Sequence, residues 1–204
     1  METVKEILPF TKPCTGSVMV PGSKSISNRA LLLSCFSQNQ VTLHGVLKSQ
    51  DVELMIEALK KVGVKLEVNW DTNVLKVNGC KGIAPIKTGE IEVGNAGTVA
   101  RFLTAWLAIQ ENSNYLFDGS DEMRERPIGQ LLEFFESGGV DVCYTQKDGF
   151  FPFETNTRKF LPHEWTVDAT KSSQMLTALM MIAPLKGQTN TILFPHGTVS
   201  RPFL

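Results

Sequence analysis

The stretch Pro21-Gly22-Ser23-Lys24-Ser25-Ile26-Ser27-Asn28-Arg29 joins a predicted strand, residues 17–20, to an apolar helix that is predicted to begin near Ser25. Gly22 permits backbone conformations that residues with a β-carbon resist. Ser23 and Ser25 can each cap the helix. The first N–H groups of a helix and its positive dipole end attract an anion. The stretch therefore predicts a turn that holds a phosphate or a carboxylate.

Two basic residues strengthen this interpretation. Lys24 places a point charge at the start of the helix, and Arg29, just over one turn further on, adds a planar guanidinium that suits phosphate or carboxylate. The alternative is an ordinary capped junction between a strand and a helix. The turn alone does not decide between the two interpretations.

The same pattern occurs three times along the chain. Val20-Pro-Gly-Ser-Lys-Ser25, Val93-Gly-Asn-Ala-Gly-Thr98 and Val167-Asp-Ala-Thr-Lys-Ser172 each leave a strand, pass a turn and enter an apolar helix. The three hydroxyl residues are almost equally spaced. Regular spacing of this kind indicates a structural repeat.

Each repeat is predicted to be a β-α-β-α-β-β unit, so the fold class is α/β. The units cover about residues 17–86 and 87–157, and a third begins near 158 and is incomplete at 204. Further strands are predicted from alternating or β-branched runs bounded by turns: 41–45, 64–68 and 74–77 in the first unit, 115–118, 140–144 and 151–154 in the second, and 191–194 in the third. Second helices are predicted from about Asp51 and from about Pro127.

The first helix of each unit is apolar on nearly every side, through 30–36, 102–109 and 175–183. Such helices are usually buried, whereas the second helix of the first unit has one polar face. We therefore expect a central core of three helices with sheets outside. If the three helices run parallel, their N-termini form one shared anion-binding mouth.

Candidate ligand-binding groups gather at these helix starts. Asn95 and Gly97 offer an amide and room for a close approach, and Ser172, Ser173 and Gln174 place two hydroxyls and an amide at the third helix. The cations are Lys24, Arg29, Arg101, Arg124, Arg126, Lys171 and Arg201. General acids and bases are sparse, the candidates being Asp51, Glu125, Glu164 and Asp168, of which Asp51 and Asp168 also suit helix caps or turns.

Composition narrows the class of protein. The chain has 204 residues, 42% of them hydrophobic and 20% charged, and a net charge of −1, which gives no general attraction for nucleic acid. No apolar run reaches membrane-spanning length and no signal peptide is recognisable, so we expect a cytoplasmic protein. No metal or cofactor is expected. The cysteines and histidines lack the spacing of metal ligands; they are Cys14, Cys35, Cys80, Cys143, His44, His163 and His196. The four cysteines are expected to be reduced structural thiols.

Four stretches together resemble the enolpyruvyl transferase family, and within it the enzymes that act on shikimate-3-phosphate. They are the stretch from Pro21 to Arg29, Gly94-Asn-Ala-Gly-Thr98 with Arg101, Arg124-Glu-Arg-Pro-Ile128, and Ser172-Ser-Gln174. The resemblance implies two lobes of three β-α-β-α-β-β units each. It also implies transfer of the enolpyruvyl group of phosphoenolpyruvate to the 5-hydroxyl of shikimate-3-phosphate, which releases phosphate in aromatic amino-acid biosynthesis.

The resemblance also implies roles for matched positions. Lys24 and Arg126 would be catalytic, Lys24 touching both substrates. Arg126 and Gly97 would line the phosphoenolpyruvate site, where the herbicide glyphosate competes in this family. The shikimate-3-phosphate side would be held by Ser25, Arg29, Ser172, Ser173, Gln174 and Ser200.

Two features depart from the family pattern. Phe203 stands where the family often has a tyrosine, and the family is roughly twice as long as this chain. The groups that move protons would lie in a second lobe, which residues 1–16 would join, while 17–204 form the first. We therefore expect an N-terminal fragment that binds shikimate-3-phosphate weakly without turnover.

Two alternatives stay open at this point. An enolpyruvyl transferase acting on UDP-N-acetylglucosamine shares the fold and donor. However, its pattern has Asn where Ser25 stands, and it usually has a cysteine in the loop before the arginine motif, whereas 112–125 contain none. The other alternative is a noncatalytic module that binds anions at the same helix starts.

Overall fold

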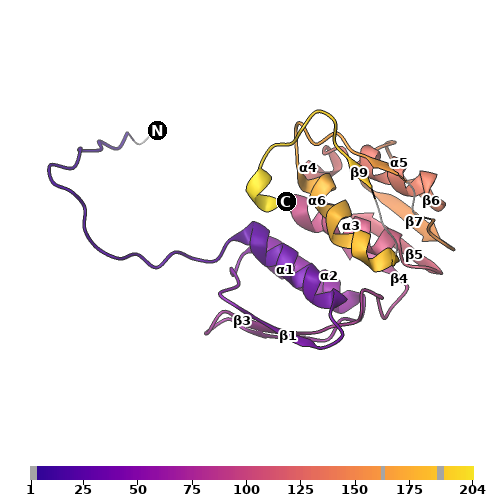
Figure 1. Ribbon diagram of the computed structural model, residues 1–204, viewed down its shortest axis with the longest axis horizontal. Coiled ribbons are helices and arrows are strands. Elements are labelled where there is room, and N and C mark those ends of the chain that lie inside the picture. The colour runs from indigo at the N-terminus through magenta and orange to yellow at the C-terminus, as the bar shows by residue number, and fades with distance from the viewer. Residues whose placement is uncertain (1–3, 162–163, 188–190) are drawn as a thin grey trace.

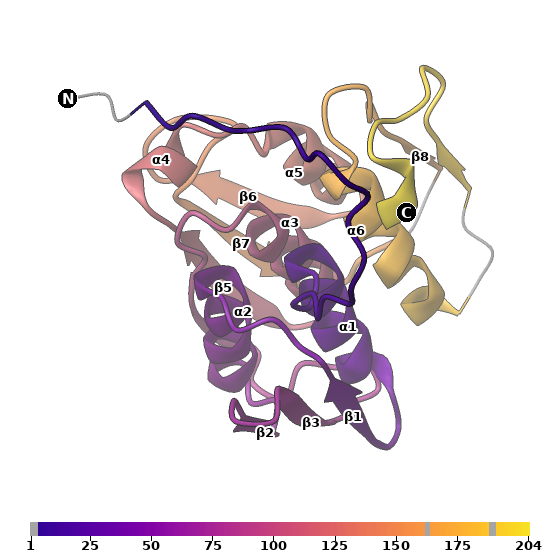
Figure 2. The same cartoon turned by 90° about the vertical axis from the view of Figure 1, so that its left-hand side faces the viewer.

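The structure is a computed structural model that describes residues 4–161, 164–187 and 191–204. His163, one of the histidines weighed as metal ligands, and the first three residues of segment 1–16 lie outside the described residues. Helices occupy the middle of the molecule and the two larger sheets lie on its outside, as Figures 1 and 2 show. This arrangement confirms the predicted α/β fold with central helices.

The second repeat forms the complete β-α-β-α-β-β unit. Its elements are β4 (Thr88–Glu92), α3 (Gly97–Ala108), β5 (Ser113–Asp118), the short α4 (Asp121–Arg124), α5 (Gly129–Ser137), β6 (Val140–Tyr144) and β7 (Phe153–Thr157). The sheet order is β4-β5-β7-β6, in which β4 lies parallel to β5 and the other pairs are antiparallel. The sequence did not predict α4, and β7 begins two residues later than expected.

The first repeat forms a smaller sheet. Its elements are α1 (Lys24–Phe36), β1 (Gln40–His44), α2 (Gln50–Lys61), β2 (Leu66–Asn69) and β3 (Val74–Asn78). The strands are antiparallel in the order β1-β3-β2. Ser49, rather than Asp51, caps α2, because its hydroxyl accepts a hydrogen bond from the Val52 N–H at 3.4 Å.

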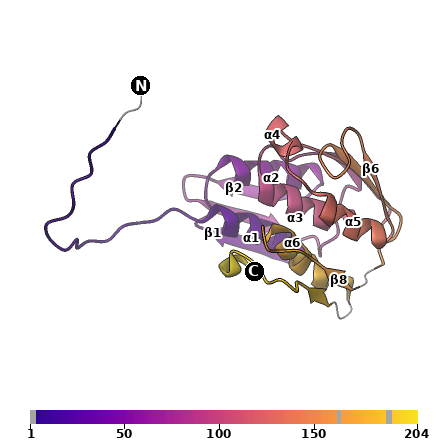
Figure 3. The same cartoon turned by 90° about the horizontal axis from the view of Figure 1, so that it is seen from above.

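The predicted strand at 17–20 is wrong. Residues 4–20 extend away from the rest of the molecule (Figures 1 and 3), and Val18, Met19 and Val20 are 75–95% exposed. A strand needs a neighbour for its backbone hydrogen bonds. The repeat pattern would place that neighbour at β1, yet among the described residues β1 pairs with β3 alone.

The third repeat contains β8 (Trp165–Thr166), α6 (Gln174–Ile182), η1 (Ala183–Lys186), β9 (Ile192–Leu193) and η2 (Arg201–Phe203). β8 and β9 are parallel, and Ala169 forms a parallel bridge with Thr198. The predicted order of strand, helix and strand is therefore present. The turn before α6 and the segment before η2 lie side by side.

The hydrophobic core joins all three first helices. In α3 every residue from Thr98 to Ala108 is buried, as expected for a helix that is apolar on all sides. α1 and α6 depart from this expectation, because Ile26, Leu33 and Met180 remain 42–58% exposed. Full burial of a leucine or phenylalanine side chain contributes roughly 1.5–3 kcal/mol, so α3 is the best-anchored of the three.

Candidate anion-binding site at the helix N-termini

The first turns of α1, α3 and α6 meet at one end of the core. Asn28 Nδ2 donates to Thr98 Oγ1 at 2.8 Å, which joins α1 to the start of α3. Arg29 Nη2 donates to Thr177 Oγ1 at 3.3 Å, which joins α1 to α6. Near the other ends of α1 and α3, the rings of Phe36 and Trp106 are 6.1 Å apart. α1 and α3 therefore run parallel, and the positive ends of their dipoles lie together.

The turn that opens α1 holds a charge at its first residue. Ser23 Oγ accepts a hydrogen bond from the Ile26 N–H at 3.4 Å, so Ser23 is the N-cap. Lys24 follows, and its ammonium lies 3.0 Å from Asp51 Oδ2 in the first turn of α2. The Lys24 side chain stays about half exposed, so its ammonium is accessible to a ligand.

Arg29 contacts three elements. Its guanidinium donates to the Ser25 carbonyl at 2.8 Å and the Phe203 carbonyl at 3.0 Å, and it lies over the rings of Phe102 and Phe203. Burial lowers the pKa of Arg29. Phe203 thus contributes a ring face and a backbone carbonyl to Arg29 but lacks the hydroxyl that a tyrosine would add.

The turn that opens α3 lacks a capping side chain. Ala96 is its N-cap, and no side-chain hydrogen bond to the first turn is found among the described residues. A β-carbon on Gly97 would lie 2.9 Å from Gln174 Oε1 and 3.6 Å from Arg126 Nη1. Arg126 Nη1 also lies 3.5 Å from the Asn95 carbonyl. Gly97 therefore keeps open the space where the α3 turn, Gln174 and Arg126 meet.

A cavity of about 370 Å³ lies beside these residues. It carries three cationic side chains, one carboxylate and the hydroxyl and amide of the third repeat. Its lining residues are Arg101, Arg126, Pro127, Gln130, Asp168, Lys171, Ser172, Gln174 and Met175. Because the cationic side chains outnumber the carboxylate, the cavity suits a ligand that carries phosphate or carboxylate groups.

Arg101 is the buried cation of this cavity. Its Nη2 donates to the Pro127 carbonyl at 2.9 Å, and its Nη1 lies 3.5 Å from Met123 Sδ. Burial, with a smaller effect of the nearby Arg126, lowers the pKa of Arg101 to about 10. Arg101 thereby fixes the loop that carries Arg126.

Gln130 and Met175 are lining residues that the sequence interpretation missed. Gln130 lies in the first turn of α5 and Met175 in the first turn of α6. The expected location of the site was the start of the first helix of each repeat. Applying the same criterion to the second helices would have indicated Gln130. Asp168 is mainly a turn residue, because its Oδ1 accepts from the Thr170 N–H at 2.9 Å and the Thr170 hydroxyl at 2.6 Å.

Other candidates lie outside the cavity or are largely occupied. Arg124 forms a two-bond pair with Asp118, at 2.9 and 2.6 Å, which lowers the pKa of that carboxyl. Ser173 is buried as the N-cap of α6. Ser200 is exposed, at φ 53°, and among the described residues it does not line the cavity.

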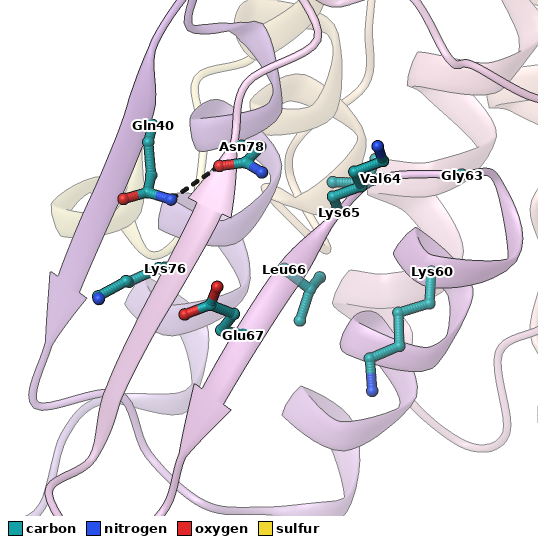
Figure 4. Close-up of a pocket in the computed structure, with 9 residues that line it drawn as sticks. All are labelled: Gln40, Lys60, Gly63, Val64, Lys65, Leu66, Glu67, Lys76 and Asn78. Atoms are coloured by element: carbon teal, nitrogen blue, oxygen red, sulfur yellow. Dashed lines mark hydrogen bonds between the residues drawn. The ribbon is translucent and has the colours of Figure 1, made fainter.

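A larger cavity of about 530 Å³ lies at the outer part of the first repeat (Figure 4). Two of its polar side chains bond to protein groups: Gln40 Nε2 donates to Asn78 Oδ1 at 2.8 Å, and Lys60 Nζ lies 3.3 Å from Glu57 Oε1. Glu67 stands opposite Lys76 in the strand register. It contains none of the predicted site residues. The cavity at the helix starts is therefore the better candidate for an anion site.

Neither a metal site nor a membrane-spanning helix is found in the part of the chain that the structure describes. There, no three histidine, cysteine, aspartate or glutamate side chains are grouped so that they could hold a metal ion. Nor does any helix within 4–161, 164–187 and 191–204 have the length and apolar character needed to cross a membrane.

Comparison with known proteins identifies the family. The family model described as EPSP synthase (3-phosphoshikimate 1-carboxyvinyltransferase) matches residues 10–202. The chain belongs to the EPSP synthase family. Relatives named 3-phosphoshikimate 1-carboxyvinyltransferase include those of Opitutus terrae, 41% identical over 88% of this chain, and Neisseria meningitidis serogroup B, 40% identical over 97%.

The match leaves much of these relatives uncovered. This chain spans 42% of the Opitutus protein, 45% of the Neisseria protein and 47% of a relative from Trichormus variabilis that is 35% identical over all of this chain. The solved EPSP synthase of Acinetobacter baumannii shares the fold, with a TM-score of 0.77 at 19% identity, over 90% of this chain and 41% of that one. The chain thus has the fold of a little under half of an EPSP synthase.

Proposed function

We propose that this chain supplies the shikimate-3-phosphate side of an EPSP synthase, which transfers the enolpyruvyl group of phosphoenolpyruvate to the 5-hydroxyl of shikimate-3-phosphate. The main support is the cavity where Arg101, Arg126 and Lys171 face the hydroxyl of Ser172 and the amide of Gln174. Membership of the family adds the reaction class. In this proposal, residues 17–204 form the first lobe and 1–16 join a second, and the protein is cytoplasmic.

Positioning and electrostatics are the proposed contribution of this lobe. Lys24 and Arg126 neutralise charge on the two substrates, and Arg126 with Gly97 holds phosphoenolpyruvate, the place where glyphosate would compete. Ser25, Arg29, Asn95, Ser172, Ser173, Gln174 and Ser200 hold or orient the substrates, in most cases shikimate-3-phosphate. Fixed cations stabilise charge that develops at a reacting carbon because they need no reorganisation during the reaction.

The second lobe is proposed to supply the groups that move protons. In the reaction, the 5-hydroxyl oxygen adds to the enol carbon of phosphoenolpyruvate to give a tetrahedral intermediate, from which phosphate then leaves. The cavity described here offers cations and one turn-bound carboxylate, Asp168, as its charged groups. This set can bind anions, but it lacks a well-placed proton acceptor, so we expect binding without turnover from this chain alone.

Isothermal titration calorimetry with shikimate-3-phosphate tests the proposal. We expect weak one-to-one binding that is lost in Lys24→Ala and reduced in Arg29→Ala, whereas Lys60→Ala, in the other cavity, binds normally. Equal binding by all four proteins would contradict the proposed site. Stabilisation by UDP-N-acetylglucosamine but not by shikimate-3-phosphate would favour the sister enzyme, and product formed by the purified chain would refute the requirement for a second lobe.

A further inference from the structure

Two thiols meet on the side of the first repeat opposite the anion site. Cys35 lies in the last turn of α1 and is fully buried, while Cys80 follows β3 and is partly exposed. The Cys80 N–H donates to the Cys35 carbonyl at 2.8 Å, and the Cys80 thiol lies 3.1 Å from the same oxygen. This direct backbone link keeps the two Cα atoms within roughly 6.5 Å, and disulfides span roughly 4.4–6.8 Å.

Both sulfurs lie against the last turns of α1, Cys35 Sγ 3.4 Å from the Leu31 carbonyl and Cys80 Sγ 3.1 Å from the Cys35 carbonyl. Contact with Cys80, followed by burial, raises the pKa of Cys35. Contact with the Cys35 thiol lowers the pKa of Cys80, with further help from the backbone N–H groups of Gly82 and Ile83. The pair is therefore asymmetric, because the Cys35 sulfur is buried whereas Cys80 is partly exposed and its thiolate form is favoured. Nucleophilic reactions of cysteine proceed through the thiolate.

Cys80 is partly exposed, and hydrogen bonds hold the loop that follows it in place. Trp106 Nε1 and Gln110 Nε2 donate to the Gly82 carbonyl at 2.8 and 3.0 Å, and Lys87 donates to Gln110 Oε1 at 3.0 Å. A cavity of about 290 Å³ beside the loop is lined in part by Gly82 and Lys87.

We propose that Cys35 and Cys80 form a reversible redox pair, in which Cys80 reacts first with a hydroperoxide and Cys35 then closes an intrachain disulfide. The Cys80 sulfur attacks a peroxide oxygen, the O–O bond breaks, and a sulfenic acid forms while water or an alcohol leaves. The Cys35 sulfur then attacks the Cys80 sulfur, the S–O bond breaks, and the hydroxyl leaves with the Cys35 proton as water. Two thiols lose two hydrogen atoms, and the peroxide accepts the two electrons.

The proposed oxidation of Cys35 and Cys80 does not depend on substrate binding, so it can be tested without substrate. Cys14 and Cys143 are exposed and lie in other parts of the chain, so their replacement isolates the pair. We would therefore study Cys14→Ala/Cys143→Ala protein, fully reduced and then treated with one equivalent of hydrogen peroxide. Trypsin separates Cys35 and Cys80 into peptides 30–48 and 77–81, because cleavage follows Arg29, Lys48, Lys76 and Lys81.

We expect the two peptides joined, with a mass two hydrogen atoms below their sum, and separated again by a dithiol reductant. The oxidised protein should melt roughly 5–10 °C higher, since a disulfide that fits the native fold restricts the unfolded chain. In the Cys35→Ala variant, dimedone should label Cys80 as a sulfenic acid, whereas Cys80→Ala should leave Cys35 unlabelled. Folded protein that gives no joined peptide, label mainly on Cys35, or oxidation that lowers the melting temperature would each overturn the proposal.

Discussion

The turns that open the first and second repeats occupy equivalent positions but contribute different properties. In the first, Ser23 caps α1 and Lys24 supplies a charge that is shared with Asp51. In the second, Ala96 leaves the start of α3 without a side-chain cap, and Gly97 supplies space. One turn provides a cation, and the other provides the backbone N–H groups of a helix start beside a cation that comes from a later loop.

The two turns are also anchored differently. Before the second turn, β4 pairs with β5, and the Val93 N–H donates to the Asp118 carbonyl at 2.9 Å. Before the first turn, residues 17–20 are exposed, and the chain enters the fold at Gly22, which packs against the backbone of Gly45. The same repeat can therefore hold the chain that leads into a helix either through a paired strand or through a close backbone contact.

The largest effect is expected at that backbone contact. A β-carbon at Gly22 would lie 2.1 Å from the Gly45 carbonyl oxygen and 3.1 Å from the Leu47 nitrogen, so Gly22→Ala requires the backbone to move. We expect a loss of roughly 2–3 kcal/mol in the free energy of unfolding, measured by urea denaturation. Pro21→Ala, at the exposed neighbouring residue, should change it by less than about 0.5 kcal/mol. Equal losses would mean that the contact does not anchor the turn.

The next effect separates two arginines of one motif. Arg126 lines the cavity above the second turn, so Arg126→Ala should weaken phosphoenolpyruvate binding, measured by calorimetry with saturating shikimate-3-phosphate, by roughly 10- to 100-fold. Arg124 is occupied by Asp118, so Arg124→Ala should lower thermal stability and leave affinity within about twofold. A larger loss of affinity in Arg124→Ala would reverse the two roles.

Local pattern was sufficient to predict much of this architecture. The almost equal spacing of Ser25, Thr98 and Ser172 predicted three repeats, and apolar residues on nearly every side predicted that α3 is buried. These predictions are correct because the spacing of apolar residues and the residue types of turns depend on short segments of sequence. The strand predicted at 17–20 failed because strand formation depends on a partner that is distant in the sequence.

The candidate site was only partly predictable for a related reason. Residue type and position indicated Arg101, Arg124 and Arg126 alike, and the family resemblance alone singled out Arg126. The folded chain adds that Arg124 pairs with Asp118 while Arg126 lies beside Gly97. Which cation stays available depends on tertiary contacts that the spacing of residues does not contain. Gln130 was missed because it carries no charge and belongs to no repeated turn.

A smaller effect should appear at Gly97, and it should differ in kind from that at Gly22. The nearest atoms to an added β-carbon belong to the flexible ends of Gln174 and Arg126, not to backbone. Gly97→Ala should therefore keep the stability of the fold, while affinity for phosphoenolpyruvate falls about three- to tenfold because the amide is displaced into the site. Calorimetry and thermal melting on the same samples separate the two quantities. A fall in stability as large as that of Gly22→Ala would show that both turns depend on close packing.

The smallest effect concerns the anchor of the second turn at low pH. Hydrogen bonding from Arg124 holds the pKa of Asp118 below its ordinary value, near 3.9 in the unfolded chain. The folded state therefore binds protons less readily at this carboxyl. Its stabilisation is fully present above about pH 4 and is lost as the pH falls through the folded-state pKa.

Asp118→Asn should accordingly melt roughly 1–3 °C below the unmodified chain at pH 7, and the difference should shrink towards zero near pH 2.5, as measured by circular dichroism. Asp121→Asn is the matched control, because Asp121 lies 3.5 Å from Arg124 but its side chain is 98% exposed. It should show almost no difference at either pH. If the Asp118→Asn difference persists unchanged at pH 2.5, the pair with Arg124 is not what fixes the end of β5, and the second turn must depend on the β4–β5 hydrogen bonds alone.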